Sequence, residues 1–485
     1  MCETCDLYEP FKLPKMKCLF LISFLYFSFF ATAQSLNKSQ VNTIEQSIKE
    51  EIKNSSTPGL SICIINNGKI AYQHSFGIAN TTTNIPVTDS TVFEIASLTK
   101  IFTSIALQTA LQKQGIGINE PIGNVIKGLA PGMSAVTYAQ LLSHTSGIID
   151  AWPVRADLTD NVLAYFADAG DKGLFEEPGK VFSYSNNGFA LAGLALATIN
   201  KTSYTKAVED FILKPLKMTN SSFNIYDVAY RSFAVGHTID PKGTAIPTLM
   251  SFYKKSQPAG GLFSNIKDLS TFAISLLNSG NFNNDQAINA QVIDTLFSKR
   301  INVFSVPVGP LNYATFPEGS YGYGTIHFTY NNLRFIGHPG EAVSQNAFFF
   351  LEPNKKFAVI MLSNRGFYLF MNSFKKIVDV VLGVKETKLM PFNEKNKNYQ
   401  PFTGKYIVPD ITRDVKQWSE VFEQEGKLFM KLEDNRTFEL KQIGDAEFSF
   451  KDPGFLFPSA IAFYKDAEGK YKYLNYLFRT RIKTE

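Results

Sequence analysis

An apolar run that leads into Ser97 and Lys100 constrains the fold of this chain more than any other segment. Apolar residues precede the serine and then recur after it at helical spacing: Val92, Phe93, Ile95, Ile101, Ile105, Ala106 and Leu111. The pattern predicts a buried helix that Ser97 opens. The first turn of a helix carries unpaired N–H groups and the positive end of the dipole, so it favours an oxyanion formed beside Ser97.

Ser97 and Lys100 lie one turn apart on the same helix face. Burial can lower the pKa of a lysine from about 10.4 until its amine accepts or relays the serine proton, which makes the pair an activated nucleophile. The alternative is an N-cap serine followed by a solvated lysine. The Ser-x-x-Lys spacing alone cannot decide between these two interpretations, because the same spacing recurs at Ser35/Lys38, Ser203/Lys206, Ser251/Lys254, Ser264/Lys267 and Ser373/Lys376.

Further motifs follow Ser97 in a fixed order and give residues 45–385 a resemblance to a known family. The chain resembles the serine β-lactamase and penicillin-binding-protein superfamily, in its class C-like branch of esterases, D-amino-acid peptidases, carboxypeptidases and β-lactamases. The segments that carry the resemblance are Pro58-Gly59-Leu60-Ser61, Ser97 to Lys100, Leu141 to Gly147, Pro178-Gly179 before Tyr184-Ser185-Asn186, Lys214-Pro215-Leu216, Pro258-Ala259-Gly260-Gly261 before Asp268-Leu269, and His338-Pro339-Gly340.

The resemblance implies a role for each matching residue. Ser97 is the nucleophile, Lys100 its hydrogen-bonded partner, and Tyr184 the base on Ser97 and then the acid on the leaving group. A cationic lysine nearby favours the phenolate of Tyr184. Asn186, on the same side of an extended segment, offers its amide to a substrate carbonyl and to Lys100. A tyrosine that only packs in a loop is the alternative for Tyr184.

His338-Pro339-Gly340 takes the place of the Lys-Thr-Gly strand of β-lactamases, so the resemblance implies that this strand lines the site. His338, Gly340 and Glu341 are the candidate substrate-binding residues there, and the backbone N–H groups of Glu341 and Ser97 form the oxyanion hole. His338 could be charged or neutral at working pH, or could merely close a strand end.

Two positions depart from the family pattern. Glu341 and Ser344 stand where related proteins usually have glycine. A carboxylate at Glu341, with no lysine in the strand, disfavours a substrate carboxylate nearby. This argues against β-lactamase and D-alanyl-D-alanine carboxypeptidase activity and leaves the choice among ester, amide and β-lactam substrates open.

Other features limit cofactors and partners. The resemblance makes the loop with His144 a structural support beneath the site, and the remaining histidines lack the spacing of metal ligands. We therefore expect no metal and no cofactor, and small-molecule or peptide substrates. A net charge of +5 over 485 residues without a basic cluster gives no support for nucleic-acid binding. Oligomeric state stays open.

The N-terminus predicts export. Met16-Lys17 precedes an apolar stretch from Cys18 to Phe30, and Ala31-Thr32-Ala33 then offers a cleavage site. Residues 16–33 are predicted to be a signal peptide cut near Ala33, and residues 1–15 a non-native leader before the true start at Met16. The stretch is too short to span a bilayer, so we expect no stable membrane span after cleavage, and a periplasmic or secreted protein.

The order of predicted elements indicates an α+β fold. A helix near 37–53, strands near 60–66, 69–76 and 322–363, and a helix near 367–382 surround a helical middle. By resemblance, residues 34–385 form an antiparallel sheet of five strands flanked by helices, plus an all-helical subdomain. A polar linker at 386–400 precedes short strands at 402–408, 427–432, 437–440, 448–451, 460–464 and 471–478. Residues 401–485 resemble a small lipocalin-like β-barrel.

These features predict an exported serine hydrolase that forms an acyl-enzyme on Ser97 and acts on an ester, an amide or a peptide, including one with a D-residue. The alternative is a penicillin-recognising binding or sensor protein with little turnover. Ser97, Lys100, Tyr184 and Asn186 are all present, which favours the enzyme.

Overall fold

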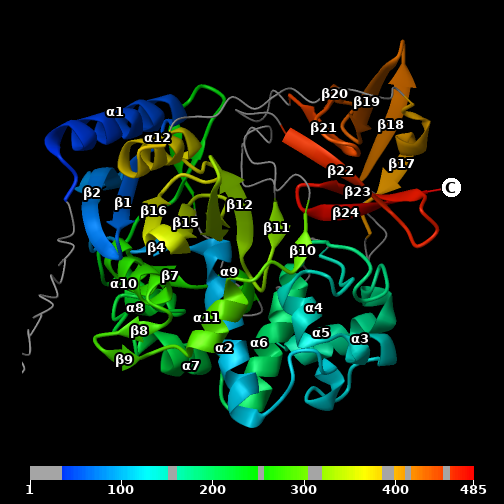
Figure 1. Ribbon diagram of the computed structural model, residues 1–485, viewed down its shortest axis with the longest axis horizontal. Helices are drawn as coiled ribbons and strands as arrows, with labels where there is room; N and C mark the ends of the chain where they lie inside the picture. The colour runs from blue at the N-terminus through cyan, green and yellow to red at the C-terminus, as the bar shows by residue number, and fades with distance from the viewer. Residues whose placement is uncertain are drawn as a thin grey trace, which may run out of the picture.

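The computed structural model describes residues 35–150, 161–248, 256–303, 319–384, 398–409, 417–451 and 459–484. The predicted leader, the signal peptide and nearly all of the linker lie outside these residues. In the described part, a large antiparallel sheet with helices on both faces is followed by a closed β-barrel (Figure 1). The predicted fold class is therefore confirmed.

The sheet has the strand order β10-β11-β12-β13-β15-β16-β1-β2-β3, with β14 paired to β15. It contains ten strands rather than the expected five, because short strands extend both edges. Every pairing is antiparallel, and Ile62 of β1 lies opposite both Met361 and His74. The strands are β1 Gly59–Asn66, β2 Lys69–Asn80, β3 Ile85–Pro86, β10 Ile301–Asn302, β11 Ser320–Tyr321, β12 Ile326–Tyr330, β13 Leu333–Gly337, β14 Gly340–Glu341, β15 Asn346–Glu352 and β16 Phe357–Ser363.

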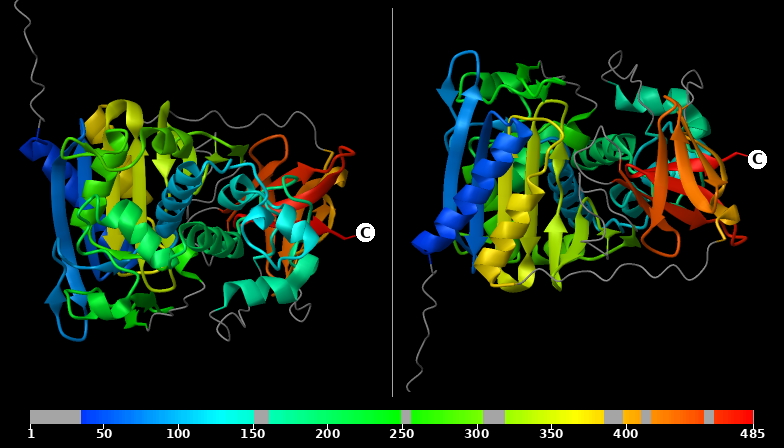
Figure 2. Two further views of the ribbon diagram at one scale, coloured as in Figure 1. Left: turned by 90° about the horizontal axis from the view of Figure 1, so that it is seen from below. Right: turned by 90° about the horizontal axis from the view of Figure 1, so that it is seen from above.

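Both faces of the sheet are buried. Along β15, Phe348 and Phe350 join the core on one side and Phe349 joins the core on the other, as the two-residue period of a strand requires. Two helices, α1 (Lys38–Ser55) and α12 (Met371–Leu382), lie side by side over the first face (Figures 1 and 2). Such double burial explains why these strands read as nearly continuous apolar runs.

The two covering helices begin and end where the local chemistry dictates. A capping box between Asn37 and Gln40 starts α1, and Ser56 in a left-handed conformation ends it. α12 begins at Met371 rather than near 367, because Phe367 and Phe370 both have a φ of 53° and cannot continue a right-handed helix.

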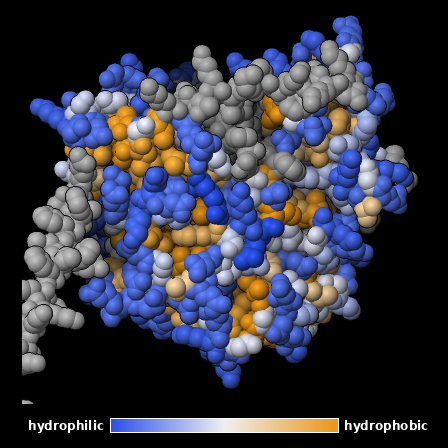
Figure 3. Space-filling view, in the orientation of Figure 1, coloured by the Kyte–Doolittle hydropathy of each residue, from blue (hydrophilic) through white to orange (hydrophobic). Residues whose placement is uncertain are grey.

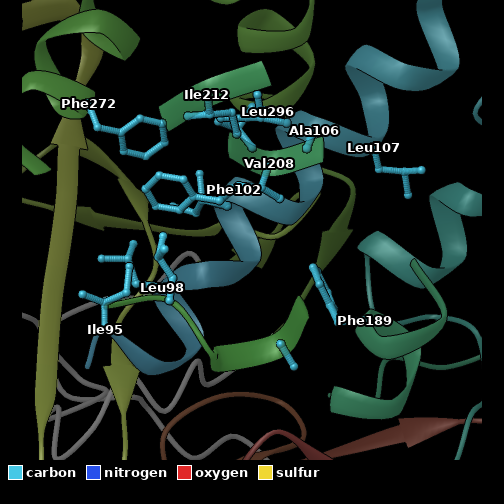
Figure 4. Packing of buried hydrophobic residues seen from close by; sticks show 14 of the residues in the cluster. Ile95, Leu98, Phe102, Ala106, Leu107, Phe189, Val208, Ile212, Phe272 and Leu296 are labelled. Atoms are coloured by element: carbon cyan, nitrogen blue, oxygen red, sulfur yellow. The ribbon is translucent and has the colours of Figure 1, made fainter. Parts of the chain in front are cut away.

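The second face of the sheet packs on the helical part of the chain. α2 is buried almost all round, and Phe102 of α2 stacks on Phe272 of α10 (Figure 4). Phe272 in turn contacts Phe349 of the sheet. The helices of this part are α2 Thr99–Gln114, α3 Pro131–Ala135, α4 Tyr138–Leu142, α5 Val162–Ala169, α6 Asn186–Asn200, α7 Tyr204–Val208, α8 Ile225–Ala229, α9 Gln257–Gly260, α10 Ile266–Leu277 and α11 Ala290–Leu296.

Three pairs of short strands accompany these helices: β4 Phe93–Glu94 with β7 Phe263–Ser264, β5 His237–Ile239 with β6 Ala245–Pro247, and β8 Asn281–Phe282 with β9 Asp285–Gln286. On the face shown in Figure 3, hydrophilic residues alternate with smaller hydrophobic areas. Across the described residues, every helix is too short or too polar to span a bilayer.

The C-terminal barrel closes because β24 pairs with β17. Aromatic side chains fill its interior, among them Phe402, Phe448 and Phe463. Its strands are β17 Gly404–Ile407, β18 Trp418–Gln424, β19 Lys427–Leu432, β20 Thr437–Gln442, β21 Glu447–Phe450, β22 Ser459–Lys465, β23 Tyr471–Tyr476 and β24 Arg479–Lys483.

Two predictions for the barrel were wrong. β18 was missed, because the buried Ser419 interrupts the apolar alternation of that strand. The predicted strand 471–478 runs two residues too far, since β23 ends at Tyr476 and the chain reverses at Leu477 and Phe478, and β24 was also missed.

Candidate active site

Ser97 lies in a 3-10 turn, Ala96–Leu98, that runs directly into α2 at Thr99. The prediction that Ser97 opens the helix is therefore wrong by two residues, because the α-helix begins at Thr99 and Ser97 lies in the 3-10 turn before it. Ala96 has a φ of 43°, a conformation that costs a non-glycine residue energy and that often occurs beside reacting groups. A Cβ on Gly340 would lie 1.9 Å from the Ile95 carbonyl oxygen, so β14 must run against this turn.

Lys100 is fully buried one turn after Ser97. Its Nζ donates to Ser97 Oγ at 3.1 Å, to Asn186 Oδ1 at 2.8 Å and to the Ala259 carbonyl oxygen at 2.7 Å. Burial lowers the pKa of Lys100 well below its usual value. The amine is thus held by three acceptors and can still lose a proton easily. Helix spacing brings Lys100 to Ser97 as predicted.

Tyr184 reaches the same serine from the other side, with its hydroxyl 2.9 Å from Ser97 Oγ. Burial raises the pKa of Tyr184 well above its usual value, although the Ser97 hydrogen bond opposes the shift. The phenol form therefore prevails in the resting site, and the expectation that the lysine favours the phenolate was wrong. Desolvation of a fully buried ring outweighs the Ser97 hydrogen bond and the Arg479 charge, which both lower this pKa.

A chain of hydrogen bonds links His144, Tyr321 and His338 beneath Tyr184. Ser185 N donates to His144 Nδ1 at 3.0 Å, and Tyr321 Oη lies 3.1 Å from Nε2 of both histidines. The geometry assigns a proton to His144 Nε2, which donates to Tyr321, and Tyr321 then donates to His338. The ring of His144 packs 4.2 Å from that of Tyr184.

His338 and His144 are both neutral in this arrangement. Burial lowers the pKa of His338 to about 3, and burial together with the Lys100 charge holds that of His144 well below its usual value. Of the two states that the sequence left open for His338, desolvation thus favours the neutral one. His338 Nδ1 lies 2.5 Å from the Pro339 carbonyl oxygen and donates to it.

Asn186 is the first residue of α6, not part of an extended segment as predicted, because Ser185 caps that helix. Its amide nonetheless faces Lys100. The sequence did not single out Asp150, whose Oδ1 accepts the Asn186 backbone N–H at 2.6 Å and whose Oδ2 lies 3.3 Å from Asn186 Nδ2. The only signal was a carboxylate directly after the apolar pair Ile148-Ile149.

The β23–β24 turn of the barrel lies against the same site. The Phe478 carbonyl accepts the Tyr184 backbone N–H at 2.9 Å, and Arg479 Nη2 lies 2.7 Å from Asp150 Oδ2. These contacts join residues about 300 positions apart, so no local pattern in the sequence predicts them.

Glu341, on β14, carries an exposed side chain to which no described residue pairs. Enough protein surrounds the carboxylate that desolvation raises its pKa to about 7. Its charge also raises the pKa of Tyr184. Glu341 thus places an accessible acid near Tyr184, and its role in substrate binding stays a prediction.

A second Ser-x-x-Lys pair, Ser203 and Lys206, has a structural role instead of a catalytic geometry. Ser203 caps α7 by accepting the Lys206 N–H at 3.2 Å, and the Lys206 side chain pairs with Asp210 in solvent.

In the part of the chain that the structure describes, no three His, Cys, Asp or Glu side chains gather into a metal site.

Comparison with known proteins assigns this site to a family. The Beta-lactamase family model matches residues 44–375, and the chain therefore belongs to the Beta-lactamase family. The barrel lies beyond the matched residues.

Two curated relatives illustrate the range of the family. The chain is 26% identical over 336 residues to Protein flp of Staphylococcus aureus, which covers 68% of this chain and 63% of the relative. It is 22% identical to penicillin-binding protein 4 of Amycolatopsis lactamdurans, over 72% of this chain and 93% of the relative. The chain thus spans less than two thirds of the length of the Staphylococcus protein.

Solved structures share the fold over nearly the whole chain. The crystal structure of SurE superimposes with a TM-score of 0.74 and 21% identity, covering 92% of this chain and 99% of SurE. The octameric penicillin-binding protein homologue from Pyrococcus abyssi gives a TM-score of 0.63 and 23% identity, covering 91% and 100%.

Proposed function

We propose that this protein is an exported serine hydrolase that forms an acyl-enzyme on Ser97 and releases the acyl group with water. One observation carries the proposal: Ser97 Oγ lies 3.1 Å from Lys100 Nζ and 2.9 Å from Tyr184 Oη. A hydroxyl between a lysine of lowered pKa and a buried phenol has a proton acceptor and a proton donor at hydrogen-bond distance.

The directions of the two pKa shifts suggest how the proton moves. Lys100 takes the proton of Ser97 as the serine oxygen attacks the substrate carbonyl carbon. Tyr184 donates its proton to the leaving group, which leaves a Tyr184 phenolate and a Lys100 ammonium beside the acylated serine. In deacylation the attacking water gives its proton to the phenolate, and Lys100 returns its proton to Ser97 Oγ as the serine leaves. The products of acylation are the Ser97 ester and the free alcohol or amine, and water reverses the sequence to release the acid. Family resemblance makes Tyr184 the base instead; both routes need the same three residues.

The oxyanion that forms in this reaction needs donors. The close approach of Gly340 to the Ile95 carbonyl supports an oxyanion hole from the backbone N–H groups of Ser97 and Glu341, because it brings β14 to the turn that carries the serine. Asn186 and His338 lie beside this turn and complete the proposed substrate-binding set.

The substrate is an ester or an amide, including a peptide with a D-residue. A structure of SurE, which shares the fold, contains D-Leu, and penicillin-binding protein 4 is a relative by sequence. Glu341 argues for substrates without a carboxylate close to the reacting carbonyl. The signal sequence predicted at residues 16–33 supports action in the periplasm or outside the cell.

Covalent labelling tests the proposal. Purified protein is treated with a fluorophosphonate, and peptide mass spectrometry locates the label in wild type, in Ser97→Ala and in Ser203→Ala. We expect label on Ser97 in wild type and no label in Ser97→Ala. Ser203→Ala is the control: it removes the serine of another Ser-x-x-Lys pair, leaves Ser97 and Lys100 unchanged, and should be labelled on Ser97 like wild type. Turnover of short-chain esters and D-residue amides should follow the label. A stoichiometric burst without turnover would instead support the binding or sensor protein.

A further inference from the structure

The turn between β23 and β24 has an unusual conformation for its residues. Tyr476 pairs with Arg479, so the turn consists of Leu477 and Phe478 alone, with φ values of 52° and 65°. Two-residue hairpin turns with both φ positive normally contain asparagine and glycine. Two bulky residues here cost conformational energy, and such strain persists only where surrounding contacts hold it.

The contacts that hold the turn are made to the segment that carries Tyr184. The Phe478 carbonyl accepts from Tyr184 N at 2.9 Å. Thr480 N donates to Ser183 Oγ at 3.1 Å, and Thr480 Oγ1 donates to the Phe182 carbonyl at 2.7 Å. Three hydrogen bonds therefore tie the barrel turn to three consecutive residues that end at Tyr184.

Arg479, the next residue, extends this link to Lys100. Its Nε and Nη2 lie 3.1 Å and 2.7 Å from Asp150 Oδ2. Asp150 holds the backbone and side-chain amides of Asn186, and Asn186 Oδ1 accepts from Lys100 at 2.8 Å. The Asp150 side chain is only 6% exposed, so its charge requires a partner, and Arg479 provides one.

The charges of Asp150 and Arg479 also shift the pKa values of the residues around Ser97. Besides burial, the Asp150 charge raises the pKa of Lys100 and the Arg479 charge lowers it. Arg479 also lies 5.7 Å from the Tyr184 ring centroid and lowers the pKa of that phenol. Among the described residues, the remaining titratable groups that act in the site are His144, Tyr321, His338 and Glu341.

We propose that Arg479 is a positioning residue of the hydrolase: through Asp150 it fixes Asn186, and through Asn186 it fixes Lys100 beside Ser97. The barrel thereby completes the active site, rather than only standing next to it. This inference rests on the proposed function, because it assigns Arg479 to the same acyl-transfer site.

Replacing Arg479 tests the proposal. Arg479→Ala should lower kcat by about 10²-fold, the usual effect of misplacing a reacting group by about 1 Å, and leave KM for a small ester within a few fold. Guanidinium at sub-denaturing concentration should restore part of the rate, and Arg479→Lys should retain more activity than Arg479→Ala. Without the Arg479 charge the pKa of Lys100 rises, because that charge lowers it. The pH profile of kcat/KM in Arg479→Ala should therefore shift to more alkaline pH than in wild type.

Lys472→Ala is the matched control. Lys472 also joins the barrel to the hydrolase, through Glu176 at 3.2 Å, but lies outside the chain of contacts to Lys100. Its loss should leave the pH profile and kcat unchanged.

The outcomes separate the two proposals. If wild type carries no fluorophosphonate label and turns over no substrate, the proposed function fails. If wild type is active and Arg479→Ala has the same kcat and pH profile, only the positioning role fails. Activity lost without guanidinium rescue or a pH shift would also overturn the role, since it indicates mere loss of folding. Should Arg479→Ala not fold, the comparison of kcat and pH profile is made on Arg479→Lys.

Discussion

Ser97 Oγ lies between an amine and a phenol whose proton affinities are moved in opposite directions by burial. A low pKa for Lys100 and a high one for Tyr184 favour the neutral pair over an ammonium and a phenolate. An uncharged pair costs less to bury, and it can pass a proton through the serine without first separating charge. Mutations of either residue should disturb this balance of proton affinities.

Removal of the phenol should therefore slow the reaction without unfolding the protein. Tyr184→Phe is expected to reduce turnover by roughly 10²–10⁴-fold, the usual contribution of a general acid–base group. Steady-state kinetics on a p-nitrophenyl ester would measure it. Tyr72→Phe, which removes a hydroxyl that donates to Glu45 on the far helix, should keep wild-type turnover. Equal rates for Tyr184→Phe and wild type would remove Tyr184 from the mechanism.

Glu341 should make substrate choice depend on pH. Because its pKa is about 7, the carboxyl is neutral below that pH and charged above it. The kcat/KM ratio of a carboxylate-bearing substrate to its neutral amide should fall as pH rises through 7. In Glu341→Gln the ratio should stay flat and, at alkaline pH, exceed that of wild type roughly 10-fold, since like charges a few ångströms apart repel by about 1–4 kcal/mol. A parallel decline in both proteins would rule Glu341 out as the cause.

Local spacing revealed Ser97 and Lys100, whereas the family resemblance was needed for Tyr184, which lies 87 positions from Ser97. Lys100 follows Ser97 by one helical turn, so spacing and apolar context were enough to pair them. Arg479 and Asp150 are 329 positions apart, and their contact depends on how the barrel docks. The protonation states were also out of reach, because desolvation of Tyr184 and His338 follows from burial that only the folded protein has.

At the scale of elements, α1 and α12 are joined by one buried acid. Glu51 of α1 accepts from Tyr368 Oη at 3.1 Å, and from the backbone N–H groups of Asn372 and Ser373 at 3.2 and 2.7 Å. Those N–H groups belong to the first turn of α12, whose N-cap, Phe370, offers no side-chain acceptor. Glu51 thus caps a helix more than 300 residues away in sequence.

Loss of this cap should destabilise the protein. Glu51→Ala leaves buried N–H groups without an acceptor, and we expect it to lower the free energy of unfolding by about 2–4 kcal/mol. Urea denaturation followed by circular dichroism would measure the change. Glu50→Ala, an exposed neighbour on the same helix, should change stability by less than about 0.5 kcal/mol. Equal midpoints for both variants would contradict the capping role.

Elements with strong periodicity were predicted well, and those with unusual turns were not. The α1 helix and the β1–β2 hairpin were placed within a few residues, because capping residues and apolar runs mark them. Leu477 and Phe478 carry no turn signal, so the sequence predicted one strand where the chain reverses. The reversal is accompanied by hydrogen bonds to the β-lactamase-like domain, which no propensity encodes.

At the scale of the whole molecule, the barrel is anchored at two separate places. One is the turn at Phe478 and Arg479, and the other is Glu176, which accepts from Lys472 at 3.2 Å and from Tyr473 Oη at 2.6 Å. Both lie on the β23–β24 side of the barrel, which Figure 1 shows facing the helical part. Two anchors fix the orientation of one body on the other.

Export should leave a shorter chain. If residues 16–33 are a signal peptide, protein recovered from the medium or periplasm of an expressing bacterium should begin at Gln34. N-terminal sequencing together with intact mass would show this. An exported protein that retained residues 1–15 would contradict both the leader and the signal-peptide predictions.

The place of Arg479 beyond the family match, which ends at residue 375, has a genetic consequence. A nonsense mutation at codon 479 would spare every residue of the family match and every motif by which such a gene is recognised. By the proposed role of Arg479 the allele would nevertheless lose activity, because the encoded protein would lack both Arg479 and β24, the strand that closes the barrel. Judging such genes intact from their catalytic motifs alone would therefore overlook inactive copies.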